Sequence, residues 1–585
     1  MRPSAVIADG GPARRAAVAA LLALLATADS VAAHDRAAGR IDDARGEPVG
    51  GALVTVTDPD GGRATTVYTD ALGRFMLPEL ARARYDLRAR HPDFRELLRP
   101  ATTIGPATAL PLRVERAADP AARAAALPPS HWTALVLARL SSQAHRAELL
   151  RQCTFCHQLG SPAVRRPRDA GAWRAAIDAM APLGGRLSPG LAAELPVALA
   201  GAYDAAAAPA TAGPAPEPPR AAVVTEWVVG EPGTSLHDVA IAPDGAVFAV
   251  DMMHDRVYRL DPASGARTTW EIPAGGAAPG GVFAATELRL PAGATAQAAP
   301  ESLRVAADGT VWVALAYRGA IGRLDPVAGT WTIDDAAADR YPQTLRLDPQ
   351  GRVWYTLALA NAVAVRDPAT GAHRTFQLPT RSLGEALAAW LWPFGGRARL
   401  PRPIPAPAIG PDLPFPSGLA VASDGAVWFS QIDAHRIGRL DPASGGIRTW
   451  STPFPGPRDL ALDAAGGVWV AGFETGVVAR FDALTGQFQT WMLPVVPPGT
   501  ATPYALCVDR RTDAVWLTGT GSDTLIRFER WHEQFTVAPL PTRGTAPRRI
   551  ACDDAGTVWT ASAAIPPSHA EDPRARFVRV SRDGP

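Results

Sequence analysis

The stretch Asp424-Gly-Ala-Val-Trp-Phe429, followed by Arg436-Ile-Gly-Arg-Leu-Asp-Pro442, is the clearest copy of a motif that recurs along the second half of the chain. Each copy predicts an apolar strand, an acidic-glycine turn, a second strand that usually starts Val-Trp, and later a strand that ends at an aromatic residue. Most copies are spaced by roughly 40 to 50 residues, the length of a four-stranded propeller blade, and two longer gaps predict blades with insertions. The second strands are marked by Phe248, Trp312, Trp354, Trp428, Trp469, Trp516 and Trp559.

The seventh repeat provides only three strands, at residues 549–552, 557–561 and 577–580. An unassigned segment before the first repeat, residues 223–229, resembles the fourth strands of the other repeats because it ends in Thr-Glu-Trp-Val-Val. A closed ring must leave no blade with an open edge. Residues 221–585 therefore predict a seven-bladed β-propeller closed by its N-terminal strand.

The repeat is similar to that of the virginiamycin B lyase (streptogramin lyase) family over roughly residues 221–585. The resemblance implies a propeller, and in active lyases it implies histidines on two adjacent blades, a glutamate after a blade Trp, and Mg²⁺. Here His237 matches one family histidine and Asp251 stands on its blade in place of a glutamate. The second histidine is missing, and elimination needs both a positioned base and an electrophile. A C–O lyase activity is therefore disfavoured.

Two rings of positions at the strand ends are expected to converge on the axis of the propeller. Arginines clustered there can hold a carboxylate or phosphate in bidentate fashion, so a small molecule or peptide is a possible ligand; the alternative is a ring that merely faces water. His237, Asp251 and Tyr504 are the candidate catalytic residues. The first ring is His237, Glu301, Gln343, Ser417, Arg458, Tyr504 and Arg548, and the ligand candidates among them are Glu301, Gln343, Arg458 and Arg548.

Ahead of the repeats, residues 153–157 read Cys-Thr-Phe-Cys-His. This spacing is typical of a c-type haem site, in which two thiols form thioethers to the porphyrin vinyl groups and the histidine binds iron. A redox or zinc Cys-x-x-Cys would need a βαβ context or a second ligand pair, and neither lies near. We therefore expect one covalent haem c on Cys153 and Cys156, with His157 as the proximal ligand.

The sixth iron ligand is predicted to be Met180, because a thioether raises the potential of an electron-transfer haem. Met180 shares a helix face with Trp173 and Ile177, so core filling is the alternative. His145 is the second candidate. Residues 132–152 read as one helix, and residues 130–204 as a small all-α monohaem cytochrome c domain.

The N-terminal part predicts export and a further β domain. Arg14-Arg15, an apolar run over residues 16–26 and small residues before His34 indicate a signal peptide, residues 1–33, and hence a bacterial periplasmic or secreted protein. No later run is long enough to cross a bilayer. Residues 38–116 alternate as a small β-sandwich, and Gly46-Glu-Pro-Val-Gly-Gly-Ala52 with Thr69-Asp-Ala-Leu-Gly-Arg-Phe75 resembles the carboxypeptidase regulatory-like (transthyretin-like) domain. That resemblance implies a structural or docking unit without a catalytic centre.

Other features complete the expected multidomain, mainly β architecture. Residues 205–220 form an Ala/Pro linker, and residues 273–300 and 380–414 are insertions. Cys507 and Cys552 stand one position out of step in the aligned repeats, so we expect them to face opposite sides and stay free thiols. A disulfide between them is the alternative in an exported protein. A formal net charge of +1 gives no field for binding nucleic acid.

The sequence thus favours an exported haem protein that transfers electrons to or from a redox partner protein, with the propeller as scaffold or binding platform. The alternative is a haem-coupled oxidoreductase that acts on a small substrate at the propeller axis. A streptogramin B lyase-like enzyme is the third interpretation.

Overall fold

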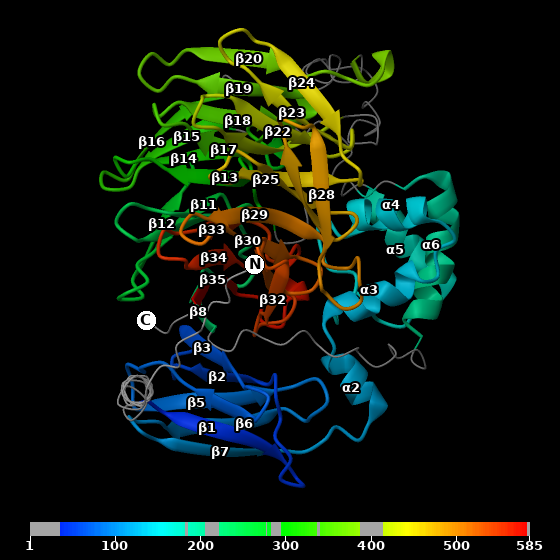
Figure 1. Ribbon diagram of the computed structural model, residues 1–585, viewed down its shortest axis with the longest axis vertical. Helices are drawn as coiled ribbons and strands as arrows, with labels where there is room; N and C mark the ends of the chain where they lie inside the picture. The colour runs from blue at the N-terminus through cyan, green and yellow to red at the C-terminus, as the bar shows by residue number, and fades with distance from the viewer. Residues whose placement is uncertain are drawn as a thin grey trace, which may run out of the picture.

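The computed structural model describes residues 36–181, 185, 187–204, 222–276, 278–281, 294–335, 340–386 and 414–581 (Figure 1). The predicted signal peptide and the linker at residues 205–220 lie outside the described residues. So do most of the insertion at residues 380–414 and residues 277 and 282–293 of the other insertion. The described chain is mainly β and has three parts: an N-terminal β domain, a helical region and a large propeller-like ring.

The ring consists of four-stranded antiparallel sheets, here called blades 1 to 7. Blades 1 and 2 are β9 (Leu236–Ile241), β10 (Val247–Asp251), β11 (Arg256–Leu260), β12 (Arg267–Glu271), and β13 (Pro300–Val305), β14 (Val311–Leu315), β15 (Ala320–Asp325), β16 (Thr330–Asp334). Blades 3 and 4 are β17 (Pro342–Leu347), β18 (Val353–Leu357), β19 (Ala362–Arg366), β20 (His373–Gln377), and β21 (Pro416–Val421), β22 (Val427–Gln431), β23 (Arg436–Leu440), β24 (Ile447–Ser451).

Blades 5 and 6 are β25 (Pro457–Leu462), β26 (Val468–Gly472), β27 (Val477–Asp482), β28 (Gln487–Met492), and β29 (Pro503–Asp509), β30 (Ala514–Gly519), β31 (Thr524–Glu529), β32 (Gln534–Pro539). Blade 7 is β33 (Ile550–Cys552), β34 (Val558–Ala561), β35 (Ala575–Ser581) and β8 (Val223–Val229). The first strand of each blade contacts the first strand of the next, and β33 contacts β9, so the ring is closed.

Neighbouring blades pack face to face, and the repeated aromatic residue supplies one of the two faces. Trp469 of blade 5 packs with Leu506 and Leu517 of blade 6, and Trp559 of blade 7 packs with Val239 of blade 1. Because side chains alternate along a strand, the Trp face of one blade meets the opposite face of the next. The Val-Trp repeat thus encodes the interfaces that hold the ring together.

The predicted closure by the N-terminal strand is confirmed, since β8 pairs antiparallel with β35 from Ala575↔Val229 to Ser581↔Val223. The same strand also pairs, along its other edge, with β3 of the N-terminal domain, from Arg63↔Trp227 to Thr66↔Val224. Blade 7 and one sheet of the N-terminal domain therefore form a continuous eight-stranded sheet, in the order β33-β34-β35-β8-β3-β2-β5-β6.

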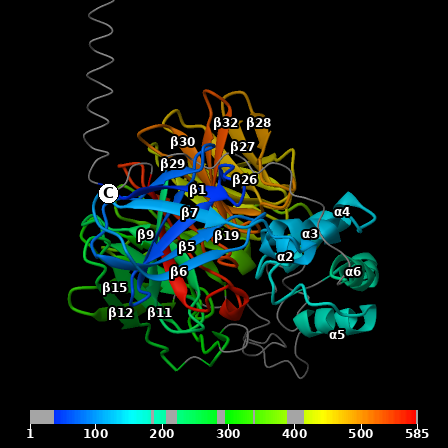
Figure 2. The same ribbon diagram turned by 90° about the horizontal axis from the view of Figure 1, so that it is seen from below.

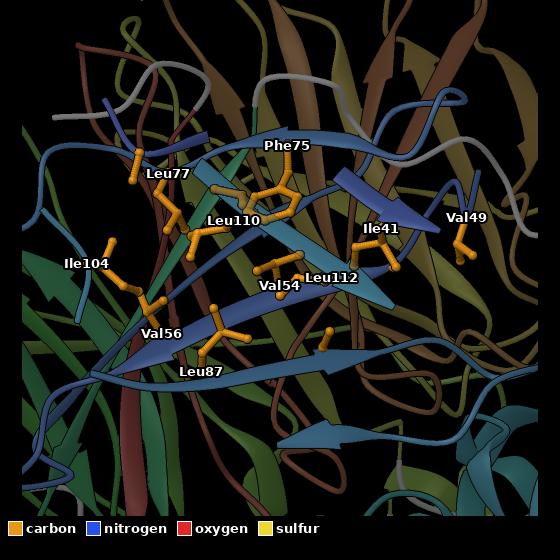
Figure 3. Close-up of a cluster of buried hydrophobic side chains, with 14 of the residues drawn as sticks. Ile41, Val49, Val54, Val56, Phe75, Leu77, Leu87, Ile104, Leu110 and Leu112 are labelled. Carbon is orange, nitrogen blue, oxygen red and sulfur yellow. The ribbon is translucent and has the colours of Figure 1, made fainter. Parts of the chain in front are cut away.

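The N-terminal domain is a two-sheet sandwich, as predicted. Its apolar core lies between the sheets and includes Ile41, Val54, Phe75 and Leu112 (Figure 3). One sheet has the order β4-β1-β7 and the other β3-β2-β5-β6. The strands are β1 (Ala38–Asp43), β2 (Leu53–Thr57), β3 (Arg63–Tyr68), β4 (Arg74–Met76), β5 (Arg84–Arg90), β6 (Leu97–Thr103) and β7 (Ala109–Val114).

Polar contacts add to the strand pairing between this domain and blade 7. The buried Arg90 binds Glu571 through a 2.5 Å Nη2–Oε1 contact, and Arg88 approaches the same carboxylate at 3.2 Å. Burial alone would raise the pKa of Glu571, but hydrogen bonds and charge from the two arginines outweigh it and lower the pKa to about 2. Tyr68 donates to the Pro539 carbonyl at 2.6 Å.

The helical region lies beside the ring, on the side of blades 5 and 6 in Figure 1 and clear of the sandwich in Figure 2. Its core includes Leu149, Leu159, Trp173 and Tyr203. The predicted single helix over residues 132–152 is wrong: the chain breaks after α3, and Ser142 caps a second helix by accepting from the His145 N–H. The helices are α2 (Pro120–Ala126), α3 (Pro129–Leu137), α4 (Gln143–Cys153), α5 (Ala170–Met180) and α6 (Pro189–Ala202). None of the helices among the described residues has the length and apolar character needed to cross a membrane.

The expectation that Cys507 and Cys552 are free thiols is wrong, because the two form a disulfide between blades 6 and 7, with Cα atoms 5.9 Å apart. Cys507 pairs with Trp516 and so lies on the Trp face of blade 6. Cys552 pairs with Val558, next to Trp559, and so lies on the opposite face of blade 7. Blades meet by opposite faces, so the one-position offset that seemed to separate the thiols brings them together.

Candidate functional site

The Cys-x-x-Cys-His motif lies at the C-terminus of α4, where the helical region meets the ring. Cys153 is the last residue of α4, and Thr154 ends the helix with its hydroxyl donating to the Leu150 carbonyl at 2.5 Å. The following turn carries Phe155, Cys156 and His157 toward the ring. Both motif thiols are free, whereas the other cysteine pair of the chain is oxidised.

The two thiols have different surroundings. Cys153 is partly buried against the helical core, and burial raises the pKa of its thiol to about 12. Cys156 is exposed to solvent, yet the surrounding protein still raises the pKa of its thiol. Arg548 and Glu301 of the ring act electrostatically on the Cys156 thiol, so this thiol lies on the side of the motif that faces the ring.

His157 faces the other imidazole of this interface, His569. Their ring centroids are 5.2 Å apart, with an edge-to-face angle of 76°. Burial and the neighbouring His569 lower the pKa of His157 to about 4, and burial and Arg166 lower the pKa of His569. Both rings are therefore neutral near pH 7, which is the form that binds metals. Within the described part of the chain, neither Nδ1 atom has a hydrogen-bond partner, although both are buried.

Phe155, the second variable residue of the motif, covers the axial end of the ring. Its ring lies 5.8 Å from that of Tyr504 and 6.2 Å from that of Phe473. The Arg458 guanidinium lies 5.2 Å from the Phe155 ring and 4.1 Å from the Tyr504 ring. Arg548 donates from Nη2 to the carbonyl oxygens of Phe155 and Cys156, both at 3.0 Å. Arg548 of blade 7 thus holds the backbone of the motif, while residues of blades 5 and 6 pack against its Phe155 side chain.

Two further side chains anchor the motif to the ring. Gln158, directly after the motif, is buried and donates to the Thr520 carbonyl at 2.6 Å and to Asp523 at 2.8 Å. Arg151, two residues before it, lies 3.4 Å from both Asp433 and Glu474. The motif is therefore fixed on both flanks by blades 4, 5 and 6.

At the axis itself, the first-ring side chains are buried and bind one another rather than facing water. The Nδ1–H of His237 donates to the Glu301 carbonyl at 2.6 Å, because a carbonyl oxygen can only accept. Its Nε2 then accepts from the Tyr504 hydroxyl at 3.1 Å. Burial, with Arg548 and Arg549 nearby, lowers the pKa of His237 far below its usual value. Tyr341 donates to the Glu301 carboxyl group, and burial raises the pKa of Glu301.

The predicted His237–Asp251 combination is not assembled. Asp251 accepts from the backbone N–H groups of Ser235 and Met253 and pairs with His254 at 2.9 Å. Its carboxylate therefore stabilises the backbone of a loop in blade 1. The lone pair of His237 Nε2 accepts a hydrogen bond from Tyr504.

Several charged and polar atoms of the axis lack partners. Arg458 is fully buried and uses Nη1 to bind the Ser417 hydroxyl at 2.5 Å. Among the described residues, its Nε and Nη2 atoms, Glu301 Oε2, Gln343 Oε1 and Arg548 Nε are buried without a partner. Buried polar groups are nearly always hydrogen-bonded, so these atoms are candidates to bind water or a small polar ligand beneath the motif.

The two predicted sixth ligands lie away from the motif turn. Met180 is the last residue of α5, and 38% of its surface is exposed. His145, near the start of α4, has its Nδ1 bound 2.6 Å from Glu194. Sequence reasoning missed His569, because it lies more than 400 residues after the motif, in a loop that belongs to no repeat position.

The residues present fit a covalently attached haem. The structure provides two free thiols, one partly buried and one exposed, and next to them a neutral imidazole whose buried Nδ1 is unpaired. The described residues contain no cluster of three or more His, Cys, Asp or Glu side chains suited to a bare metal ion. Among the described residues, the Cys-x-x-Cys pair therefore has no neighbouring side chains with which to complete a zinc site.

The contact between α4 and the ring predicts a pH dependence. Glu474, in a pocket of about 340 Å³ with Arg151 and His435, is almost fully buried, and burial raises its pKa from 4.5 to about 7. The fold favours the neutral acid, so Glu474 costs nothing below about pH 4.5, stability is lost as the pH rises from there to about 7, and the loss is complete above that pH. At about 1.4 kcal/mol per pKa unit, the loss reaches about 3 kcal/mol.

Replacing Glu474 by Gln, which mimics the neutral acid, is expected to remove this loss. Urea unfolding of the protein and of Glu474→Gln between pH 5 and pH 8 measures the difference. The two curves should differ by less than about 1 kcal/mol at pH 5 and by about 3 kcal/mol at pH 8, in favour of the variant. Equal pH profiles would contradict the assignment.

Comparisons with known proteins agree with the two β domains. Residues 405–565 match the virginiamycin B lyase family, and residues 37–115 match the carboxypeptidase regulatory-like domain. A search of curated proteins found no match.

Solved structures with a similar chain trace include two lyases and a synthase. Virginiamycin B lyase from Staphylococcus aureus has 17% identity and a TM-score of 0.46, covering 61% of this chain and 98% of its own. A streptogramin B lyase has 18% identity and a TM-score of 0.47, covering 62% and 97%. Hydrazine synthase from Kuenenia stuttgartiensis has 13% identity and a TM-score of 0.41, covering 57% and 94%.

Proposed function

We propose that this protein is an exported c-type haem protein of the bacterial periplasm that transfers single electrons. Its helical region is a monohaem cytochrome c domain, and its seven-bladed propeller is the platform against which the haem motif is held. The observation that carries the proposal is the pair of free thiols at Cys153 and Cys156, beside a buried His157, in a chain whose other two cysteines are joined. The disulfide also supports an oxidising compartment.

The residues of the site have distinct roles in this function. Cys153 and Cys156 would hold the haem through thioethers, each formed by adding an S–H across a vinyl group without an oxidant, and His157 would provide an imidazole to the iron. When bound, haem supplies one-electron chemistry at iron. Arg548 and Gln158 hold the motif backbone and its flank against the ring, and Phe155 packs on Tyr504 and Arg458 at the axis. Electrons are exchanged with a redox partner protein.

Mass spectrometry and spectroscopy of the exported, processed protein test the proposal. The expected result is a mass increase equal to one haem, located on the peptide with Cys153 and Cys156, and a c-type spectrum that appears on reduction. Unmodified thiols in material produced with a working haem-attachment system would contradict it.

A second candidate function is favoured by the unpaired polar atoms at the axis. Arg458, Glu301 and Gln343 lie under the motif turn, where a small substrate with a carboxylate or amide could pair with them. The protein would then be a haem-coupled oxidoreductase, and a substrate would reduce the haem of the purified protein without any partner. If no added small acid or amide reduces it, while an electron-donor protein does, electron transfer alone is the function.

A further inference from the structure

A haem iron that transfers electrons takes a second axial ligand. Assigning that ligand rests on the proposed function, because it concerns the same haem. Met180 and His145 were the expected candidates, but Met180 lies exposed at the end of α5 and His145 is bound to Glu194. Neither makes a described contact with the Cys-x-x-Cys-His turn. The imidazole that does meet His157 comes from the ring.

We propose that His569 is the second axial ligand, so that the iron is held between an imidazole of the helical domain and an imidazole of blade 7. The two rings are 5.2 Å apart with no described side chain paired to either Nδ1, and they come from elements that no sequence repeat brings together. They meet edge to face, so binding of both to one iron requires the His569 ring to turn and move slightly outward. Two side-chain torsions provide that freedom.

The loop that carries His569 is held from several sides. His569 lies in a short 3₁₀ turn, Pro567–His569, in which its N–H donates to the Pro566 carbonyl at 3.0 Å. Gly544 packs against this turn so closely that a Cβ there would lie 2.7 Å from the His569 carbonyl oxygen. Two residues later, the Glu571 N–H donates to the Arg543 carbonyl at 2.8 Å, and the Glu571 carboxylate binds Arg90.

These contacts give the N-terminal domain a part in the haem site. Arg88 and Arg90 of β5 bind the Glu571 carboxylate, and Glu571 lies between His569 and the start of β35. The two arginines therefore hold the end of the His569 loop that leads into β35. A fixed loop limits the adjustment to the two side-chain torsions of His569, which favours a metal site of defined geometry. The N-terminal domain, the helical region and the ring would thus all contribute to holding one haem.

Ligation by two imidazoles has a spectroscopic signature that differs from ligation by imidazole and thioether. The test uses the full-length exported holoprotein and compares the wild type with His569→Ala, His569→Met and, as matched controls, Met180→Leu and His145→Gln. We expect a low-spin ferric wild type that lacks the near-infrared band of a sulfur–iron bond. Both control variants should keep this spectrum.

His569→Ala should convert the ferric haem to high spin, and added imidazole should restore the low-spin spectrum. His569→Met should introduce the sulfur–iron band and raise the midpoint potential, because a thioether ligand favours the reduced iron. This second variant keeps a side chain at the site if the alanine variant is poorly folded.

A sulfur–iron band in the wild type that disappears in Met180→Leu would overturn the inference and leave the proposed function intact. An unchanged low-spin spectrum in His569→Ala would also overturn it. A wild-type protein without covalent haem would overturn the inference together with the proposed function, and mass spectrometry distinguishes that case from the other two.

Discussion

Replacing Cys153 and Cys156 together by Ser is expected to abolish covalent haem in the exported protein. The thioether bonds have no other sulfur within reach, because the remaining cysteines form the disulfide between blades 6 and 7. Serine preserves the size of the side chain, so the turn after α4 can still pack against Tyr504 through Phe155. The measurement is haem staining of the denatured protein together with its intact mass.

The double variant Cys507→Ala/Cys552→Ala is the matched control for this experiment. It also removes two cysteines, but it leaves the motif unchanged, and it should retain one haem per chain. Single variants at Cys153 or Cys156 should retain haem through one bond at reduced yield. Full haem occupancy in the Cys153→Ser/Cys156→Ser protein would refute the attachment site.

The same control variant is expected to show the second large effect, a loss of stability. The disulfide spans 45 residues of sequence, and in the chain-entropy description a loop of that length constrains the unfolded chain by about 4 kcal/mol. The disulfide also joins two adjacent blades. Without it, only non-covalent contacts hold β29 and β33 together. Urea unfolding followed by tryptophan fluorescence should show a clearly lower midpoint than the wild type.

Reduction of the wild type provides the comparison that separates the disulfide from the side chains. The reduced wild type and the alanine variant should unfold at similar urea concentrations, and the variant should not respond to the reductant. If the oxidised wild type and the variant have equal midpoints, the disulfide makes no contribution to the fold.

The blade strands and their packing faces were predictable from local sequence. The Val-Trp repeat determines both the strand and the face that packs on the next blade. The closing strand was predictable as well, because residues 223–229 carry the pattern of a fourth strand. The disulfide was not, because its prediction needs the rule that adjacent blades meet by opposite faces. The pairing of β3 with β8 joins two domains and has no repeat to reveal it.

The candidate site divides in the same way. Cys153, Cys156 and His157 stand in a five-residue motif and were predicted from it, and the first-ring positions were found by aligning repeats. Burial of those positions could not be foreseen, because it depends on contacts between blades and on Phe155 of another part of the chain, which packs on Tyr504 and Arg458. His569 has no sequence signal beyond its residue type, since its neighbour His157 is brought to it only by the docking of the helical region on the ring.

The strand β8 has hydrogen-bonded neighbours on both edges, β35 on one side and β3 on the other. A truncated protein that begins after the helical region would still close its last blade, but it would present a bare, mostly apolar strand to solvent. Exposed strand edges of this kind recruit other chains. Such a fragment should therefore dimerise or precipitate, which size-exclusion chromatography would detect. In the full chain, the first domain covers this edge and so prevents self-association.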